Sequence, residues 1–370
     1  MQQVEFSVNE EPPSISAHIA GTQYPLPALW LRERCQDPQH LDQITQQRLF
    51  DPHQLDESLS LTEVEQHSSS KVRLSFSDGY QGDYDLSAFF ADFDPWDGGP
   101  APQAWQSTTD KSCFYFSSAE LESEAGLMKA LQAFLIYGVI IVTDVPNEAE
   151  AILQVAEKFG HVRKTNFGKY FEVYTRPNSN DLAYRSVPLG AHTDNPYRDP
   201  TPGIQLLHCL ANQTSGGFST LVDSLSVVEK LKQEDPEGYQ LLCDIPVRYR
   251  YKDDTVELIE RRPIIQTDTS GRVEGVSYSP RLDYLPLLSE PQLVIFHRAR
   301  KRLGQLFSDP QFEWRFKLEP GQLQMFHNAR VLHGRTGFDS TEGIRHLQGA
   351  YIDLDEPKGR YKALKQSQTI

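Results

Sequence analysis

The stretch Gly190-Ala-His192-Thr-Asp194-Asn-Pro-Tyr197 decides how we interpret this sequence of 370 residues. His192 and Asp194 are two residues apart, so on an extended strand both side chains point to the same face. An imidazole and a carboxylate on one face supply two of the three ligands of a facial metal site. Such a site leaves adjacent metal positions open for substrates, as a non-haem Fe(II) oxygenase requires. The pattern is common by itself, and His40-Leu-Asp42 repeats it in a polar stretch without a strand signal.

The third ligand must come from another part of the chain, and the segment Phe326-His-Asn-Ala-Arg-Val-Leu-His333-Gly-Arg-Thr336 offers two histidines. His333 follows an apolar strand and precedes a glycine, a usual position for a residue at the mouth of a β-barrel. His327 is the competitor, and an ordinary hydrogen-bonded strand histidine is the simpler interpretation of it. We therefore predict that His192, Asp194 and His333 bind the metal.

Arg345 follows His333 in a strand-like run that ends at Tyr351. A guanidinium held inside a barrel can bind a carboxylate through two parallel hydrogen bonds. In this class of oxygenase the natural carboxylate is the distal end of 2-oxoglutarate. Tyr351 has the same strand parity as Arg345, so both side chains are expected to face inward. The alternative is a surface arginine.

The rest of the chain reads as many short strands interrupted by a few helices. Helices are expected at 119–135, from Asn147 to Phe159-Gly160, around 224–242 and at 290–307. The first hundred residues read as strands and turns, with a hairpin over 72–85 around Ser-Asp-Gly. Pro, Gly and Trp are concentrated in residues 94–106. These patterns predict a mainly β protein with flanking helices, divided into domains 1–105 and 106–370.

Composition excludes several classes of function. Lys and Arg total 36 and Asp and Glu total 51, which gives a net charge of −15. A chain this acidic is not expected to bind nucleic acid. Four scattered cysteines predict a reducing compartment rather than a disulfide framework. The N-terminus lacks the pattern of a signal peptide, and the longest apolar run, 133–142, is too short to span a bilayer. We therefore expect a cytoplasmic protein without a membrane partner.

Further motifs carry a resemblance to the γ-butyrobetaine and trimethyllysine hydroxylases. They are Pro202-Gly-Ile-Gln-Leu-Leu-His-Cys209, Gly216-Gly-Phe-Ser-Thr-Leu-Val-Asp223, Arg330-Val-Leu-His-Gly-Arg335 and Arg345-His-Leu-Gln-Gly-Ala-Tyr351. The resemblance extends over about residues 120–355, and Trp30-Leu-Arg-Glu-Arg-Cys35 and Gln47-Arg-Leu-Phe-Asp51 resemble the small N-terminal domain of that family. It implies a double-stranded β-helix (jelly-roll) catalytic domain, a small N-terminal β-rich domain, and an enzyme that is often a homodimer.

The resemblance also implies the ligands and the residues that bind them. Fe(II) would lie on His192, Asp194 and His333, with 2-oxoglutarate and dioxygen as co-substrates and with Ser219, Arg335 and Arg345 contacting the 2-oxoglutarate. The substrate would carry a trimethylammonium head in an aromatic cage of Phe167, Phe171, Tyr184 and Tyr351. A quaternary ammonium donates no hydrogen bonds, so ring faces are its best partners. For each single ring, ordinary core packing is the alternative.

The chain departs from the family at its zinc site. The family's N-terminal domain binds structural zinc through a C-x-C-x-x-C run and a distant histidine. The matching positions here are Cys35, Asp37, His40 and Tyr80. These positions would supply a thiolate, a carboxylate, an imidazole and a phenol. Structural zinc sites use cysteine and histidine ligands, so this combination is a poor tetrahedral ligand set for zinc. A structural zinc is therefore not expected, and Cys35 is predicted to be a packed thiol.

The second departure concerns the anionic end of the substrate. Asp181 would repel a carboxylate but suits an α-ammonium, as in trimethyllysine. Arg281 suits a carboxylate or a phosphonate, so 2-trimethylaminoethylphosphonate is a further candidate, and Asn195 and Tyr197 would add hydrogen-bonding groups. The alternatives are that Asp181 is a turn residue and that Arg281 pairs with Asp283.

We therefore predict an Fe(II)- and 2-oxoglutarate-dependent hydroxylase of a γ-butyrobetaine-like methylene carbon. A non-catalytic betaine-binding jelly roll and a zinc hydrolase are the competing classes. The first has no need of an open iron site, and the second leaves Arg345 and the aromatic residues unexplained.

Overall fold

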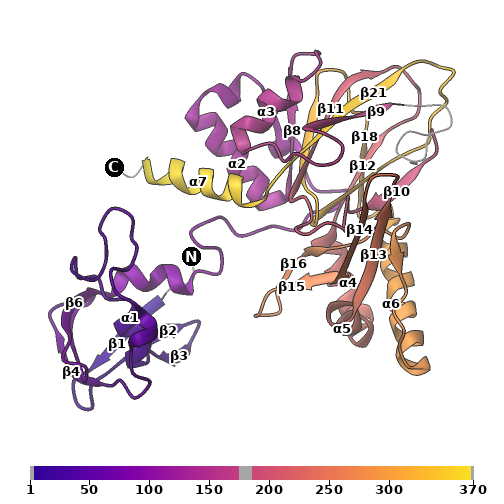
Figure 1. Ribbon diagram of the computed structural model, residues 1–370. Coiled ribbons are helices and arrows are strands. Elements are labelled where there is room, and N and C mark those ends of the chain that lie inside the picture. The colour runs from indigo at the N-terminus through magenta and orange to yellow at the C-terminus, as the bar shows by residue number, and fades with distance from the viewer. Residues whose placement is uncertain (1–3, 175–185, 368–370) are drawn as a thin grey trace. The chain divides into compact units, whose positions relative to one another are not determined.

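The computed structural model describes residues 4–174 and 186–367, and the chain forms two compact units, Met1–Gly98 and Gly99–Ile370. The described part of the N-terminal unit holds two small antiparallel sheets, one short α-helix and the 3-10 helices Pro52–Gln54 and Leu86–Phe93 (Figure 1). The first sheet comprises β1 (Val4–Asn9), β2 (Ser14–Ile19) and β3 (Thr22–Pro25), and the helix α1 (Ala28–Glu33) follows it. The second sheet comprises β4 (Leu61–Gln66), β5 (Lys71–Phe76) and β6 (Gln81–Asp85). Strands β5 and β6 form the predicted hairpin.

The C-terminal unit is built on two sheets that face each other. The larger sheet has the order β7-β8-β19-β11-β21-β9, and the smaller has the order β10-β20-β12-β18. The larger comprises β7 (Tyr115–Ser117), β8 (Val139–Thr143), β19 (Leu323–His327), β11 (Ile204–Asn212), β21 (Arg345–Ile352) and β9 (Tyr170–Tyr174). The smaller comprises β10 (Leu189–His192), β20 (Val331–Arg335), β12 (Ser219–Asp223) and β18 (Glu313–Phe316). This is the jelly-roll fold that the sequence predicts.

Alternation along the strands assigns each side chain to the inside or the outside of the barrel. On the larger sheet, Ile204 and Leu206 pack outward with the helices, whereas Leu207 packs in the inner apolar cluster. On the smaller sheet, Val222 and Leu332 face outward, whereas Leu221 faces inward. His333 is the cross-strand partner of Leu221, so it also faces inward.

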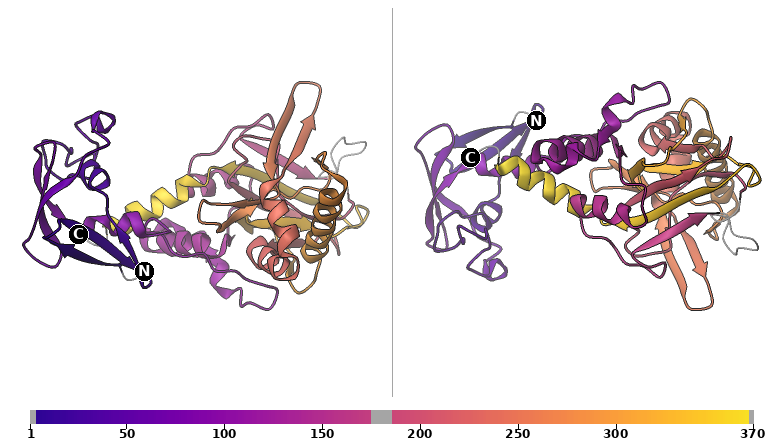
Figure 2. Two further views of the ribbon diagram at one scale, coloured as in Figure 1. Left: turned by 90° about the horizontal axis from the view of Figure 1, so that it is seen from below. Right: turned by 90° about the horizontal axis from the view of Figure 1, so that it is seen from above.

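Helices cover both outer faces. Those on the larger sheet are α2 (Glu124–Tyr137), α3 (Ala151–Phe159) and α7 (Asp355–Ser367), and α7 lies alongside α2 (Figure 2). Those on the smaller sheet are α4 (Ser224–Glu234), α5 (Pro236–Asp244) and α6 (Glu290–Phe307). They pack with the additional strands β13 (Pro246–Lys252), β14 (Glu257–Pro263), β15 (Ile265–Thr267), β16 (Val273–Val276) and β17 (Asp283–Tyr284). Within the described residues, no helix combines the length and the apolar composition that a bilayer crossing requires.

Three helix predictions need correction. The helix expected at 119–135 begins at Glu124, because the Ser123 hydroxyl caps it there and Glu120–Glu122 forms a separate 3-10 turn. The helix expected from Asn147 begins at Ala151, because Glu150 has a φ of +67°, outside the right-handed helical region, and its backbone N–H donates to Oε1 of Gln348. The helix expected over 224–242 is two helices. Asp235 ends the first and caps the second, and Pro236 occupies the first turn of the second helix, where its missing N–H costs nothing.

Candidate active site

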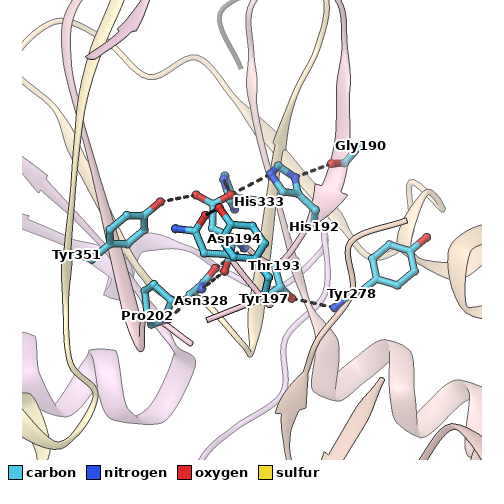
Figure 3. Close-up of polar contacts among 11 residues, drawn as sticks. Gly190, His192, Thr193, Asp194, Tyr197, Pro202, Tyr278, Asn328, His333 and Tyr351 are labelled. Atoms are coloured by element: carbon cyan, nitrogen blue, oxygen red, sulfur yellow. Dashed lines mark hydrogen bonds and ion pairs between the residues drawn. The ribbon is translucent and has the colours of Figure 1, made fainter. Parts of the chain in front are cut away.

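Three metal-ligating side chains converge inside the barrel, where β10 and β20 pair (Figure 3). His192 ends β10, His333 is its cross-strand partner on β20, and Asp194 lies just beyond β10. Nε2 of His192 lies 3.2 Å from Oδ1 of Asp194, and Nε2 of His333 lies 3.8 Å from the same oxygen. Within the described residues this is the one group of three or more such side chains that could hold a metal ion.

Hydrogen bonds fix the Asp194 segment in place. The backbone N–H of Asp194 donates to Oδ1 of the buried Asn328 over 2.8 Å, and Nδ2 of Asn328 donates to the carbonyls of Asp194 and Pro202, each over 2.9 Å. Thr193 is tied to Val276 and Tyr278 through its hydroxyl and its backbone N–H. The Tyr351 hydroxyl donates to Oδ2 of Asp194 over 2.9 Å.

The protonation of these groups suits a metal. Nδ1 of His192 lies 2.9 Å from the carbonyl of Gly190, which leaves Nε2 facing Asp194 and the metal. Burial, reinforced by the nearby His192, lowers the pKa of His333 to about 3, so its imidazole is neutral. Burial alone would raise the pKa of the Asp194 carboxyl, but His333, His192 and the Tyr351 hydroxyl lower it on balance. Two imidazoles and one carboxylate are the donor set of a non-haem Fe(II) site.

His327, the competing ligand, lies elsewhere. It is the cross-strand partner of Ile204, which packs on the outer face of the larger sheet. The second His-x-Asp pair also takes no part in this group. Asp42 accepts hydrogen bonds from the backbone of Ile44 and Thr45 in a turn of the N-terminal unit.

Arg345 is buried at the start of β21, with only 5% of its surface exposed. Its Nε donates to the carbonyl of Gly217 over 3.2 Å, and no described carboxylate lies within ion-pair distance of it. Gly217 has a φ of +67°, and a Cβ there would lie 2.8 Å from Cδ of Arg345, so glycine leaves room for the arginine. Burial lowers the pKa of Arg345 to about 10, and the guanidinium stays charged at neutral pH.

The other two predicted 2-oxoglutarate residues form a cross-strand pair on the inner face. Ser219 on β12 lies opposite Arg335 on β20, and both are buried. Nη2 of Arg335 donates to the carbonyl of Val187 over 3.5 Å. The guanidinium carbons of Arg335 and Arg345 lie 5.3 and 5.7 Å from the ring centre of Phe338. The structure therefore brings Ser219, Arg335 and Arg345 to one part of the barrel.

Aromatic rings form a chain that starts at the metal ligands. Phe171 stacks on Tyr351 with ring centres 5.2 Å apart, and Phe167 lies 6.3 Å from Phe171. Gly349 makes room for this arrangement, because a Cβ there would lie 2.3 Å from Cζ of Phe171. Tyr184 and Asp181, which the sequence also assigns to the substrate, lie outside the described residues.

Tyr251 is a member of this chain that sequence reasoning missed. Its ring lies 6.1 Å from that of Phe167 and stacks at 4.9 Å on that of Tyr197. The sequence signal was the alternating Arg248-Tyr-Arg-Tyr251 strand, which predicts β13 but not where the strand packs.

The remaining predicted substrate residues border the same region. The hydroxyl of Tyr197 donates to Oδ1 of Asn195 over 2.5 Å, and Nδ2 of Asn195 is buried without a hydrogen-bond partner. Arg281 is exposed but lies near enough to His333 to lower the pKa of that imidazole. It does not pair with Asp283, whose carboxylate instead contacts Arg300 over 2.5 Å.

The N-terminal positions that match the family's zinc ligands surround an arginine. Nη1 of Arg32 lies 3.7 Å from Sγ of Cys35 and 3.5 Å from Nδ1 of His40, and its guanidinium carbon lies 4.0 Å above the Tyr80 ring. Its Nε donates to Asp78 over 2.9 Å. Cys35 is 3% exposed, and burial raises the pKa of its thiol.

Comparison with known proteins agrees with this geometry. Residues 105–351 match the taurine catabolism dioxygenase TauD, TfdA family, and residues 18–89 match the gamma-butyrobetaine hydroxylase-like N-terminal family. A gamma-butyrobetaine dioxygenase from Pseudomonas sp. (strain AK-1) is 31% identical over 94% of this chain and 92% of its own.

Two further dioxygenases are similar to this chain along most of its length. Dioxygenase str8 from Strobilurus tenacellus is 29% identical over 94% of this chain and 87% of its own. The human mitochondrial trimethyllysine dioxygenase is 28% identical over 89% of this chain and 80% of its own. The chain therefore belongs to the TauD, TfdA family, and it is an Fe(II)- and 2-oxoglutarate-dependent dioxygenase whose iron ligands are His192, Asp194 and His333.

Proposed function

We propose that this dioxygenase hydroxylates a methylene carbon of a small trimethylammonium compound similar to γ-butyrobetaine. The observation that carries the proposal is the chain of rings Tyr351, Phe171, Phe167, Tyr251 and Tyr197, which begins at a residue hydrogen-bonded to Asp194. The substrate's cationic head would lie among these rings, and the carbon to be oxidised would lie beside the iron.

The physical basis is the ring quadrupole. A trimethylammonium group cannot donate hydrogen bonds, and each ring face attracts it by about 0.5–2 kcal/mol, more when water is excluded. Tyr351 and Tyr197 are 4% exposed, so part of this cluster is shielded from water. The relatives named gamma-butyrobetaine dioxygenase and trimethyllysine dioxygenase support the same class of substrate.

Residues near the iron also favour a substrate with an anionic end. Arg281 supplies a cation near His333, and Nδ2 of Asn195 supplies a hydrogen-bond donor without a partner in the described structure. These groups suit γ-butyrobetaine, and they also suit 2-trimethylaminoethylphosphonate, which carries more negative charge. Trimethyllysine is the third candidate. Its α-ammonium group would pair with a carboxylate, and Asp181 is the residue that could supply one.

The protein's own contribution is mainly positioning. When bound, Fe(II) with 2-oxoglutarate and dioxygen supplies the oxidant, and 2-oxoglutarate is converted to succinate and carbon dioxide. We infer that Arg345, with Ser219 and Arg335, holds the distal carboxylate of 2-oxoglutarate. The aromatic chain orients the substrate, and the Tyr351 hydroxyl holds the Asp194 carboxylate in place.

A succinate-release assay with the three candidate substrates tests the proposal. The Fe(II)-loaded enzyme should release succinate in a substrate-dependent way with at least one of them, and mass spectrometry should find a product one oxygen heavier. Choline-free buffer and an assay without iron are the controls. A protein that binds iron and 2-oxoglutarate but hydroxylates none of the three would contradict the substrate class. A protein that binds a betaine without any turnover would instead be the non-catalytic binder.

We also propose that the N-terminal domain, assigned to residues 1–105, contains no structural metal. The Arg32 guanidinium lies among the residues that match the family's zinc ligands, and its positive charge already contacts the thiol, the imidazole and the phenol ring there. Metal analysis of the purified protein should find iron but no equivalent of zinc. One zinc per chain that survives dialysis would contradict this proposal.

A further inference from the structure

Two buried glutamines face the inside of the barrel without partners. Gln205 on β11 is 2% exposed and Gln324 on β19 is 1% exposed. The side-chain oxygen of each is buried without a hydrogen-bond partner. No hydrogen bond from either side-chain nitrogen is present within the described structure. A buried amide left unpaired costs about 1–3 kcal/mol, so such groups are usually paired with protein, water or a ligand.

Strand register places Gln205 between two residues that contact the iron ligands. Its cross-strand partners are Phe326 on one side and Tyr351 on the other. The Phe326 ring lies 4.9 Å from the ring of His333, and the Tyr351 hydroxyl bonds to Asp194. Cross-strand partners point to the same face of a sheet, so the Gln205 amide faces the iron ligands from the larger sheet.

Gln324 is the next polar residue on the same face. It lies opposite Leu207, which in turn lies opposite Gly349 on β21. Moving from Tyr351 to Gly349 along β21 leads toward Arg345. Along the inner face of the sheet, Gln205 therefore lies at the level of Tyr351, and Gln324 lies farther from the iron ligands, in the direction of Arg345.

The amides and the aromatic chain lie on opposite sides of Tyr351. The larger sheet runs β19-β11-β21-β9 in this region. Gln324 and Gln205 belong to β19 and β11, whereas Phe171 belongs to β9. This arrangement separates the unpaired amides from the rings assigned to the trimethylammonium head.

We propose that Gln205 binds the metal-side end of 2-oxoglutarate by donating hydrogen bonds from its amide, and that Gln324 supports the same ligand farther toward Arg345. The inference rests on the 2-oxoglutarate site of the proposed function and not on the identity of the organic substrate. A carboxylate only accepts hydrogen bonds, so it needs donors in a buried site. The Gln205 amide is a donor group that lies beside two residues contacting the iron ligands and has no protein partner.

Anaerobic titration of the Fe(II)-loaded protein with 2-oxoglutarate tests the proposal without turnover. The charge-transfer absorption of the Fe(II)–2-oxoglutarate complex reports the Kd. Gln205→Met keeps the length of the side chain and removes its donors, so we expect the Kd to rise about tenfold or more. Gln205→Glu keeps the size but places a carboxylate against the ligand, so we expect a larger rise.

The thermal stability of the ligand-free protein distinguishes ligand binding from a structural role. Because the Gln205 amide has no protein partner, the unfolding midpoint of Gln205→Met should equal or exceed that of the parent. Gln348→Met is the matched control. Gln348 is 1% exposed on β21, but it bonds to the backbone of Glu150 and to Glu172. This control should lower the midpoint by roughly 3 °C and leave the Kd for 2-oxoglutarate unchanged.

The possible results separate this inference from the proposed function. If the parent binds 2-oxoglutarate and both Gln205 variants bind it equally well, the assignment of Gln205 is wrong. The same conclusion follows if Gln205→Met loses stability as Gln348→Met does without a change in Kd. Failure of all three trimethylammonium substrates would leave this result unaffected, because no organic substrate is present in the titration.

Discussion

The chain has two clusters of potential metal ligands, one in each unit. An arginine lies inside the N-terminal cluster, whereas the C-terminal cluster has no cation of its own. In the N-terminal unit, Arg32 lies among Cys35, His40 and Tyr80, and its guanidinium contacts the thiol, the imidazole and the face of the phenol ring. In the C-terminal unit, His192, Asp194 and His333 point their ligand atoms toward one another, all within 4.8 Å. One cluster carries its own cation, and the other must take a cation from solution. If the N-terminal cluster binds no metal, as we propose, residue types alone do not define a metal site in this chain.

Removing one iron ligand should have the largest effect. His333→Ala leaves two of the three donors, and we expect iron affinity and 2-oxoglutarate decarboxylation to fall by more than about 100-fold. His327→Ala is the matched control, because His327 lies in the same segment but faces the opposite side of its sheet. Iron content and succinate release should be measured on both. An active, iron-replete His333→Ala protein would show that His192, Asp194 and His333 do not form the metal site.

Arg345→Met should have the next largest effect. The guanidinium is the buried cation that we assign to the distal carboxylate, and a charge-assisted bidentate pair is worth about 2–3 kcal/mol. We expect the KM for 2-oxoglutarate to rise by roughly 30- to 100-fold, with unchanged iron content. Arg345→Lys should recover part of the loss, since it keeps the charge but not the fork. A normal KM in Arg345→Met would mean that another residue binds this carboxylate.

Arg32→Met tests the N-terminal cluster of Arg32, Cys35, His40 and Tyr80. It removes an ion pair with Asp78 and a cation above the Tyr80 ring, so we expect a loss of about 1–3 kcal/mol in the stability of the N-terminal unit. Hydrogen exchange over residues 18–89 should increase, while iron content and decarboxylation stay unchanged. Arg34→Met, which removes a more exposed pair with Asp92, is the control. If Arg32→Met instead gained tightly bound zinc, the arginine would be shown to exclude a metal.

Tyr251→Leu should have the smallest effect. One ring of the aromatic chain contributes about 0.5–2 kcal/mol to binding a trimethylammonium group, so we expect the KM for the organic substrate to rise about 2- to 30-fold. The KM for 2-oxoglutarate should not change, and Tyr251→Phe should stay close to the parent. A Tyr251→Leu enzyme with an unchanged substrate KM would remove this ring from the substrate pocket.

The sequence predicts the parts of the site that depend on local pattern. The spacing of His192 and Asp194 on a strand fixes their common face, and the apolar strand before His333 fixes its place on β20. The number and length of the strands predict a mainly β domain, and the family resemblance implies that it is a jelly roll. The strand parity that Arg345 shares with Tyr351 predicts an inward-facing guanidinium, which the structure buries on the inner face.

The parts that depend on packing between distant segments could not be predicted. Nothing near Asn328 in the sequence indicates that its amide spans Asp194 and Pro202. Tyr251 lies on a strand outside the barrel sheets, and its packing against Tyr197 and Phe167 brings it to the site. At the start of α3, the backbone N–H of Glu150 donates to Gln348, nearly two hundred residues away.

The contact between Gly349 and Phe171 has a consequence for redesign. Because a Cβ at 349 would lie 2.3 Å from the Phe171 ring, the two positions share one volume on neighbouring strands. Enlarging residue 349 requires shrinking residue 171, and shrinking residue 171 alone opens a void next to Tyr351. An engineer who wishes to admit a bulkier or longer quaternary amine should therefore vary these two positions as a pair, since libraries that change either one singly sample mostly clashes or cavities.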